Sequence, residues 1–150
     1  MQELDFMEQN FKVTNLDRTF GATVTDIKLT DIDDKTTKDL YRLWLDRSLL
    51  IFPDQHLTNE QQVRFAERFG KLEFDLSPIS NVRTDGTVRD ANDDDIVKSL
   101  KGNMEWHHDS TYMPVQAKGA VFTAHQVPSK EGRTGWADMT AAYEALDQSM

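Results

Sequence analysis

The sequence predicts an α+β or mostly β fold in a single domain. Predicted helices gather in the first half of the chain and predicted strands dominate the second, so the regular alternation of a doubly wound parallel sheet is missing. The 150 residues suffice for one compact domain and are too few for two. No internal repeat or low-complexity tract interrupts the chain.

The first predicted elements are two strands and a helix. Apolar and polar residues alternate over 11–16 and 22–29, which is typical of strands with one buried face. Residues 36–47 predict a helix, with Asp33 or Asp34 as its N-cap. The side chains expected on one face of this helix are Leu40, Leu43, Trp44 and Arg47.

A short apolar run and a second helix follow. Residues 48–52 are almost entirely apolar and stop at a proline, which predicts a strand buried on both faces. Thr58 and Gln61 stand three residues apart, the spacing of a capping box. The helix that they open is predicted to end at Gly70, a residue suited to the left-handed position after a helix.

The regular pattern dissolves between residues 77 and 102, which we interpret as a long loop or lid. Within it, residues 90–94 begin like a calcium-binding loop but lack the glycine and the final glutamate of that motif, so they are expected to be solvated charge. After the loop, the sequence predicts strands over 104–109, 120–127 and 134–138 and a helix over 140–146.

The composition excludes several classes of function. Seventeen basic and 26 acidic residues give a formal net charge of −9, which argues against nucleic acid and anionic membranes as partners. The absence of cysteine excludes disulfides, thiolate nucleophiles and cysteine-ligated metals. No apolar run is long enough to span a bilayer, and the acidic N-terminus is unlike a signal peptide, so we expect a cytoplasmic protein. The sequence is compatible with a homo-oligomer and does not require one.

The sharpest candidate for chemistry is the pair His107 and Asp109. On an extended segment these two side chains point to the same face, whereas His108 points to the other. An imidazole and a carboxylate suit a shared Fe(II), Mn(II) or Zn(II) ion. The alternative is an exposed pair joined by a local hydrogen bond, and spacing alone leaves both open.

Other candidates have simpler explanations. His125 alternates with apolar residues and is expected to be a hydrogen-bonded sheet residue, while His56 follows a turn and is expected to face water. The glycines of 132–135 would serve a turn, although such a turn could also cradle an anion.

Four blocks of the chain are together far more specific than the His-x-Asp pair alone. They are residues 21–29, 50–70, 106–112 and 132–146. In this order they resemble the taurine dioxygenase / 2,4-dichlorophenoxyacetate dioxygenase (TauD/TfdA) family of Fe(II)- and 2-oxoglutarate-dependent dioxygenases.

The resemblance implies a jelly-roll (double-stranded β-helix) with flanking helices, of which this chain would be the N-terminal half. It implies that His107 and Asp109 are two of three iron ligands and that Thr134 hydrogen-bonds the distal carboxylate of 2-oxoglutarate. Asn103 matches a position that lines the substrate pocket. The implied reaction uses O2 and hydroxylates a small organic substrate, expected to be anionic, with release of succinate and CO2.

The family's second histidine ligand and its 2-oxoglutarate-binding arginine have no match before Met150. We therefore expect residues 1–150 to be the N-terminal portion of a single dioxygenase domain, inactive and marginally folded alone. Two alternatives from other classes stay open. One is a Zn(II)-binding jelly-roll without redox chemistry, and the other is a non-catalytic remnant or interaction domain.

Overall fold

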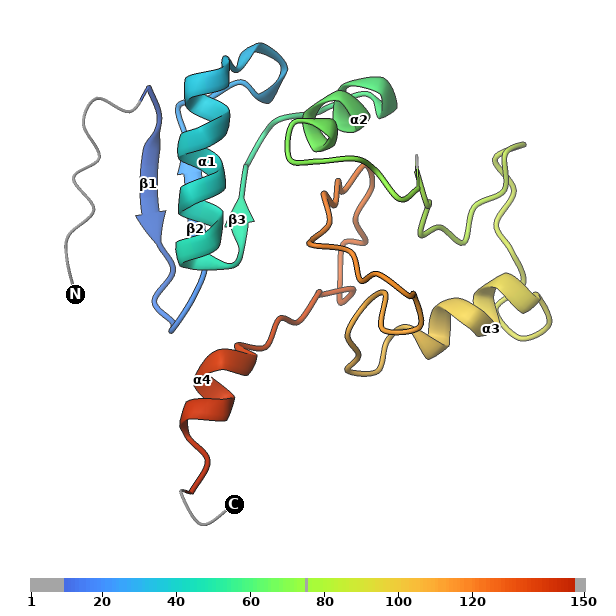
Figure 1. Cartoon of the computed structure of the whole chain (residues 1–150). Helices are drawn as coiled ribbons and strands as arrows, with labels where there is room; N and C mark the ends of the chain where they lie inside the picture. Colours follow the sequence, from blue (N-terminus) through green and yellow to red (C-terminus); the bar gives the residue numbers. More distant parts are fainter. Residues whose placement is uncertain (1–9, 75, 148–150) are drawn as a thin grey trace. The chain divides into compact units, whose positions relative to one another are not determined.

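The structure is a computed structural model and describes residues 10–74 and 76–147. The chain forms two compact units. The first combines the chain up to Gly70 with the segment from Phe122 onwards, and the second is Lys71–Val121 (Figure 1). The predicted metal pair lies in the second unit, so the two units are described separately.

A three-stranded mixed sheet is the base of the first unit. Strand β1 (Lys12–Asn15) pairs antiparallel with β2 (Ala22–Thr25), and β2 pairs parallel with β3 (Leu50–Ile51). The side chains of Ala22 and Val24 are fully buried and alternate with threonines, as the sequence pattern predicted. One face of β2 therefore belongs to the core.

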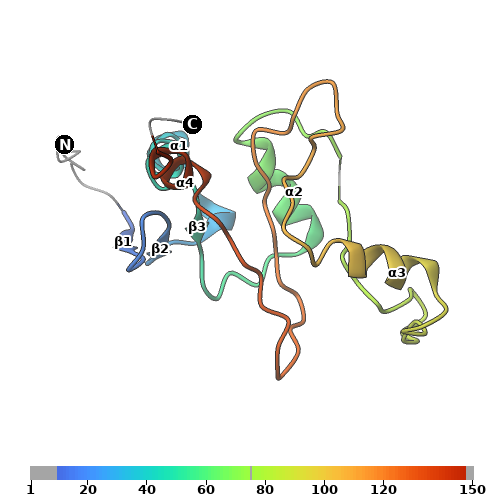
Figure 2. The ribbon, with the colours of Figure 1, turned by 90° about the horizontal axis from the view of Figure 1, so that it is seen from below.

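Helix α1 (Asp34–Arg47) lies along the sheet in both views (Figures 1 and 2). Its N-cap is Asp33, whose carboxylate accepts a hydrogen bond from the Thr36 amide at 2.7 Å. Leu40 and Leu43 are the most deeply buried residues of the helix, which confirms the predicted apolar face. A short 3-10 turn, η1 (Leu29–Asp31), precedes the helix where the sequence predicted the end of a strand.

Helix α2 (Asn59–Glu67) opens with the predicted capping box. The Thr58 hydroxyl accepts from the Gln61 amide at 3.3 Å, and the Gln61 side chain accepts from the Thr58 amide at 2.8 Å. Phe65 is buried and anchors the helix in an aromatic cluster. The rings of this cluster belong to Tyr41, Trp44, Phe52, Phe65 and Phe69.

The short strand predicted over 48–52 forms as β3 (Leu50–Ile51), but it is not buried on both faces as predicted. β3 has only two residues, and Ile51 is 42% exposed. The reason is its position, because β3 is an edge strand of the sheet, next to β2 alone.

The second unit contains more regular structure than the loop predicted for residues 77–102. A turn at Asp85 and Gly86 brings Val82 opposite Val88 in a single antiparallel bridge. Helix α3 (Asp95–Gly102) follows and buries Val97. The loop prediction is therefore wrong over the helix, whose apolar spacing is preceded by a run of aspartates that obscured it.

Three predicted strands do not form. The described segments 104–109, 120–127 and 134–138 contain no ladder of hydrogen bonds to another strand. A strand exists only where a second segment offers its backbone groups at the right register, and alternation in one segment cannot supply that partner. The small sheet and the helices still make this chain α+β.

The last predicted helix is confirmed with slightly different bounds. Helix α4 spans Met139–Glu144, and the Asp138 carboxylate caps it by accepting from the Ala141 amide at 2.9 Å. None of its residues is buried. Among the helices of the described segments, none has the length and apolarity that a membrane crossing requires.

Candidate metal centre

The predicted metal pair lies in the loop directly after α3. Three successive amides bond back to carbonyls of the helix: Asn103 to Ser99 at 3.3 Å, Met104 to Lys101 at 3.2 Å and Glu105 to Gly102 at 3.4 Å. These bonds satisfy carbonyl groups that a helix end leaves open. They also engage the amides of 104 and 105, which explains why the predicted strand over 104–109 does not begin here.

His107 and Asp109 nevertheless meet. Nε2 of His107 lies 3.0 Å from Oδ1 of Asp109, so the two side chains converge on one side of the loop. The two side chains meet on a loop and not on the predicted strand, and their contact is compatible with both a metal pair and an exposed hydrogen-bonded pair. The side chains are 48% and 79% exposed, which leaves the pair open to ions from solvent.

The other ring nitrogen of His107 is held by the backbone. Nδ1 lies 2.7 Å from the Glu105 carbonyl oxygen. A carbonyl only accepts, so Nδ1 carries the proton and Nε2 is the nitrogen whose lone pair faces Asp109 in the neutral ring. The Glu105 carbonyl raises the pKa of His107 above 6.5, and the nearby Asp109 carboxylate acts in the same direction.

This arrangement fits a divalent transition-metal ion. Two ligands at about 2.1 Å from a metal and at right angles to each other are separated by about 3.0 Å, the distance between Nε2 and Oδ1. The imidazole and carboxylate donors suit Fe(II), Mn(II) and Zn(II). Over the described residues, no third histidine or carboxylate joins the pair to complete a cluster.

His108 does not share this geometry. Its Nδ1 lies 2.8 Å from the backbone oxygen of Asp109, so the ring is engaged with the main chain. The next residue, Ser110, has a left-handed φ of 63°, which turns the chain after the pair. The expectation that His108 takes no part in the metal site agrees with this contact.

The remaining predicted site residues are divided between the two units. Asn103 belongs to the unit of His107 and is the exposed C-cap of α3. Thr134 belongs to the other unit, where it is exposed after the turn at Glu131 and Gly132. That turn requires glycine at 132, because its φ is 66° and a Cβ there would lie 2.6 Å from Cγ of Pro128.

Two features of this region were not predicted from the sequence. The contact of the Glu105 carbonyl with His107 involves a backbone group, and no pattern of side chains indicates such a contact. The hairpin at 82–88 could have been predicted, because an Asp-Gly dipeptide between two valines is a turn signal. The acidic run nearby made the whole segment look like a polar loop.

Comparison with known proteins assigns the chain to a family. The model of the taurine catabolism dioxygenase TauD, TfdA family matches residues 12–150. The chain belongs to the TauD/TfdA dioxygenase family. This confirms the resemblance inferred from the four sequence blocks.

Two members of the TauD/TfdA family are highly similar to this chain in sequence. The chain is 60% identical over 145 residues to a (S)-phenoxypropionate/alpha-ketoglutarate-dioxygenase of Sphingobium herbicidovorans, covering 96% of this chain and 50% of the relative. It is 51% identical to a protein of the same name from Delftia acidovorans, covering 95% of this chain and 51% of the relative. The chain thus spans about half the length of the curated relatives it matches.

A solved structure supports the same assignment. The crystal structure of AAD-2 in complex with Mn(II) and N-oxalylglycine superposes with a TM-score of 0.78 at 30% sequence identity. The match covers 94% of this chain and 51% of that chain. The fold described here is therefore one that a family member adopts over the same extent.

Proposed function

We propose that residues 1–150 are the N-terminal portion of a single dioxygenase domain and supply two ligands to its iron. His107 and Asp109 are these ligands, 2-oxoglutarate is the co-substrate and O2 the oxidant. The observation that carries the proposal is the 3.0 Å approach of Nε2 and Oδ1 in a chain of the TauD/TfdA family. The complete domain in this proposal is a jelly-roll with flanking helices.

The residues of the pair have distinct tasks. The Glu105 carbonyl keeps the proton of His107 on Nδ1, so that Nε2 offers its lone pair. Asp109 offers a carboxylate oxygen from two positions further along the loop and neutralises part of the ion's charge. His107 and Asp109 would hold the iron together with a third protein ligand, and the iron would also take up 2-oxoglutarate and O2.

Bound Fe(II) would supply the electron transfer between 2-oxoglutarate, O2 and a substrate C–H bond. The overall change converts 2-oxoglutarate, O2 and substrate into succinate, CO2 and hydroxylated substrate. In this proposal Thr134 donates its hydroxyl hydrogen to the distal carboxylate of 2-oxoglutarate, and Asn103 lines the substrate pocket. Residues 80–102 precede the ligand loop and would exclude water over bound substrate.

The relatives suggest the substrate class. The two most similar relatives named above act on (S)-phenoxypropionate, and at 60% and 51% identity we extend this substrate class to the present protein. A small aryloxyalkanoic acid also agrees with the expectation of an anionic organic substrate. Hydroxylation of the carbon between the ether oxygen and the carboxylate gives a hemiketal, which collapses to a phenol and pyruvate.

The test uses the complete gene product, freed of metal and kept anaerobic. Addition of Fe(II) and 2-oxoglutarate should give a visible charge-transfer absorption, which Zn(II) cannot give. Admission of O2 with (S)-2-phenoxypropionate should then release phenol and succinate in equal amounts, with the (R)-enantiomer and taurine as matched controls. Zinc binding without the absorption would favour a non-redox metal protein, and no metal binding would favour a non-catalytic domain.

A further inference from the structure

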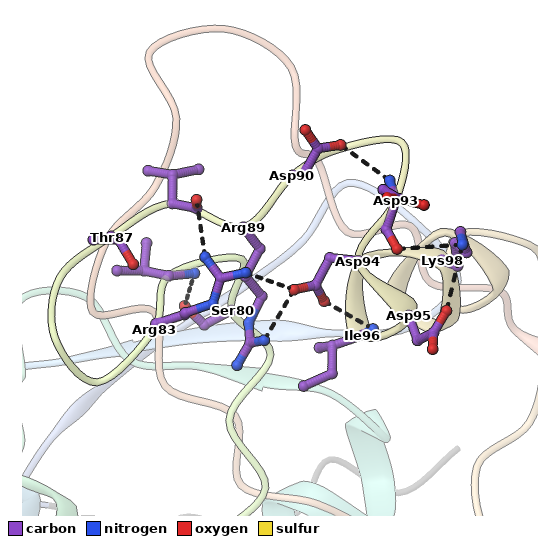
Figure 3. A network of polar contacts seen from close by, with 12 residues as sticks. Ser80, Arg83, Thr87, Arg89, Asp90, Asp93, Asp94, Asp95, Ile96 and Lys98 are labelled. Atoms are coloured by element: carbon purple, nitrogen blue, oxygen red, sulfur yellow. Dashed lines mark hydrogen bonds and ion pairs between the residues drawn. The ribbon is translucent and has the colours of Figure 1, made fainter.

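A polar network surrounds Asp94 in the second unit (Figure 3). Its centre is Asp94, whose Oδ2 lies 2.9 Å from Nη2 of Arg83 and 3.2 Å from Nη1 of Arg89. Its other oxygen, Oδ1, accepts from the Ile96 amide at 3.0 Å and thereby caps α3. One carboxylate therefore joins two arginines to the N-terminus of a helix.

The two arginines come from the hairpin around the Val82–Val88 bridge. The Arg83 amide bonds to the Thr87 carbonyl at 2.8 Å, and Nη1 of Arg83 donates to the Val88 carbonyl at 3.3 Å. The Arg89 amide bonds to the Asn81 carbonyl at 2.7 Å. The backbone of both arginines is thus held in the hairpin, and their guanidinium groups are held at Asp94.

The network is partly shielded from solvent. The side chain of Asp94 is 13% exposed and that of Arg89 is 21% exposed. Residues 90–93 are exposed, as the sequence predicted, whereas Asp94 is partly buried. Partial burial disfavours the charged carboxylate, yet hydrogen bonds from the Ile96 amide and Arg89 outweigh it and lower the pKa of Asp94 below 3.8. Asp94 is therefore ionised at neutral pH.

A continuous series of contacts runs from Asp94 to the metal pair. Helix α3 begins at the Asp94 cap, and the three amides after the helix bond back to its last turn, ending with Glu105 to Gly102. The Glu105 carbonyl then holds Nδ1 of His107. The series thus consists of the Asp94 cap, the hydrogen bonds of α3 and of its C-terminal end, and the contact between the Glu105 carbonyl and the imidazole.

We propose that Arg83, Arg89 and Asp94 form a clamp that fixes α3 against the 82–88 hairpin and thereby positions His107 for the metal. These are positioning residues, since none of them contacts His107 or Asp109 in the contacts described above. The inference rests on the proposed function, because it assigns a task to the clamp in the metal site of that function. In this inference, the polar segment before the ligand loop helps to hold His107 in position.

The central test compares Asp94→Asn with Asp95→Asn in the metal-free complete gene product. Asparagine is as good an N-cap as aspartate, so Asp94→Asn keeps the helix cap and removes the charge between the two arginines. Asp95 is 96% exposed and pairs with Lys98 at the surface, so Asp95→Asn makes the same charge change outside the clamp. The probe is Mn(II), with bound metal measured by electron paramagnetic resonance.

We expect Asp94→Asn to weaken Mn(II) binding about tenfold, the lower range for groups that orient a metal ligand, and Asp95→Asn to leave it within about twofold. The visible absorption of the anaerobic Fe(II)–2-oxoglutarate complex should shift or weaken in Asp94→Asn alone. A merely structural role would lower the Tm of Asp94→Asn and leave the affinity of the folded molecules and the absorption unchanged. That result overturns the inference.

A second pair of variants covers the case in which Asp94→Asn does not fold. Arg83 is 40% exposed and is the easier partner to replace. Arg83→Gln should weaken Mn(II) binding, and Arg83→Lys should restore most of it by returning a cation beside Asp94. Equal affinities of wild type and Arg83→Gln overturn the clamp. Absence of the visible absorption in the wild type overturns the proposed function instead, and the inference with it.

Discussion

The Glu105 carbonyl oxygen lies 2.7 Å from Nδ1 of His107 and so decides which ring nitrogen faces Asp109. The carboxylate and the carbonyl both attract a proton to the ring. When the ring is protonated, His107 and Asp109 form an ion pair, with Nε2 and Oδ1 at 3.0 Å. In the proposed site a metal ion would replace the proton on Nε2, and this competition is the basis of the first prediction.

We predict that metal binding weakens as the pH falls through the raised pKa of His107. The Glu105 carbonyl, and then Asp109, raise this pKa above 6.5, so protonation begins at a higher pH than for an isolated imidazole. Without metal, the free energy of unfolding depends on pH in the opposite direction. The charged ring of His107 stabilises the fold at low pH, and this stabilisation is lost as the pH rises through the raised pKa.

The measurement is an NMR titration of His107 in the metal-free protein, together with Mn(II) affinity over the same pH range. Asp109→Asn removes the carboxylate and should lower the pKa of His107. An unchanged pKa in that variant would contradict the assigned ion pair.

Replacement of either proposed ligand should strongly weaken metal binding. His107→Ala or Asp109→Ala leaves one ligand from this chain, so we expect Mn(II) affinity to fall at least about a hundredfold. The control is His56→Asn, because His56 is exposed and has a left-handed φ of 47° that asparagine tolerates. Isothermal titration calorimetry on the three variants checks this, and a loss in the His56 variant would point to general unfolding instead.

Thr134 should affect the co-substrate rather than the metal. Thr134→Val removes the hydroxyl with little change of shape, so we expect the KM for 2-oxoglutarate to rise about tenfold while Mn(II) affinity stays the same. Thr134→Ser keeps the hydroxyl and should stay close to the wild type. A steady-state measurement at varied 2-oxoglutarate distinguishes the variants, and equal KM values for Val and Ser would refute the role.

Local signals predicted the first half of the chain well. The caps at Asp33 and Thr58 and the buried face of α1 depend on side chains within a few residues of one another, and such contacts can be inferred from sequence spacing. Helix α3 was missed although Asp94 caps it in the same manner. The neighbouring aspartates made the segment look like a polar loop.

The second half was predicted less well because its elements depend on distant partners. The alternation over 120–127 and 134–138 indicates segments with one apolar and one polar face. A strand also needs a neighbouring strand, and no described segment provides one. The pair at His107 and Asp109 was found for a different reason. Residue type and family resemblance pointed to it, and the two side chains meet in the loop after α3 rather than on a strand.

The core beneath α1 should tolerate little change. Leu40 is fully buried, so Leu40→Ala is expected to destabilise the protein by about 2–5 kcal/mol through lost burial and a cavity. Leu45, on the same helix, is 63% exposed, and Leu45→Ala should cost less than about 0.5 kcal/mol. Urea unfolding of both variants provides the comparison. Similar losses would mean that α1 does not pack as described.

The capping box of α2 offers a final test of a local contact. Thr58→Ala removes the acceptor for the Gln61 amide, and we expect a loss of about 1 kcal/mol in the free energy of unfolding. Thr58→Ser keeps the hydroxyl and should lose much less. Because the Thr58 hydroxyl bonds an amide of the first turn, the loss should also appear as faster hydrogen exchange at the first amides of α2. Phe65, further along α2, packs in the aromatic cluster. Unchanged exchange in Thr58→Ala would show that packing of Phe65, rather than the cap, holds this end of the helix.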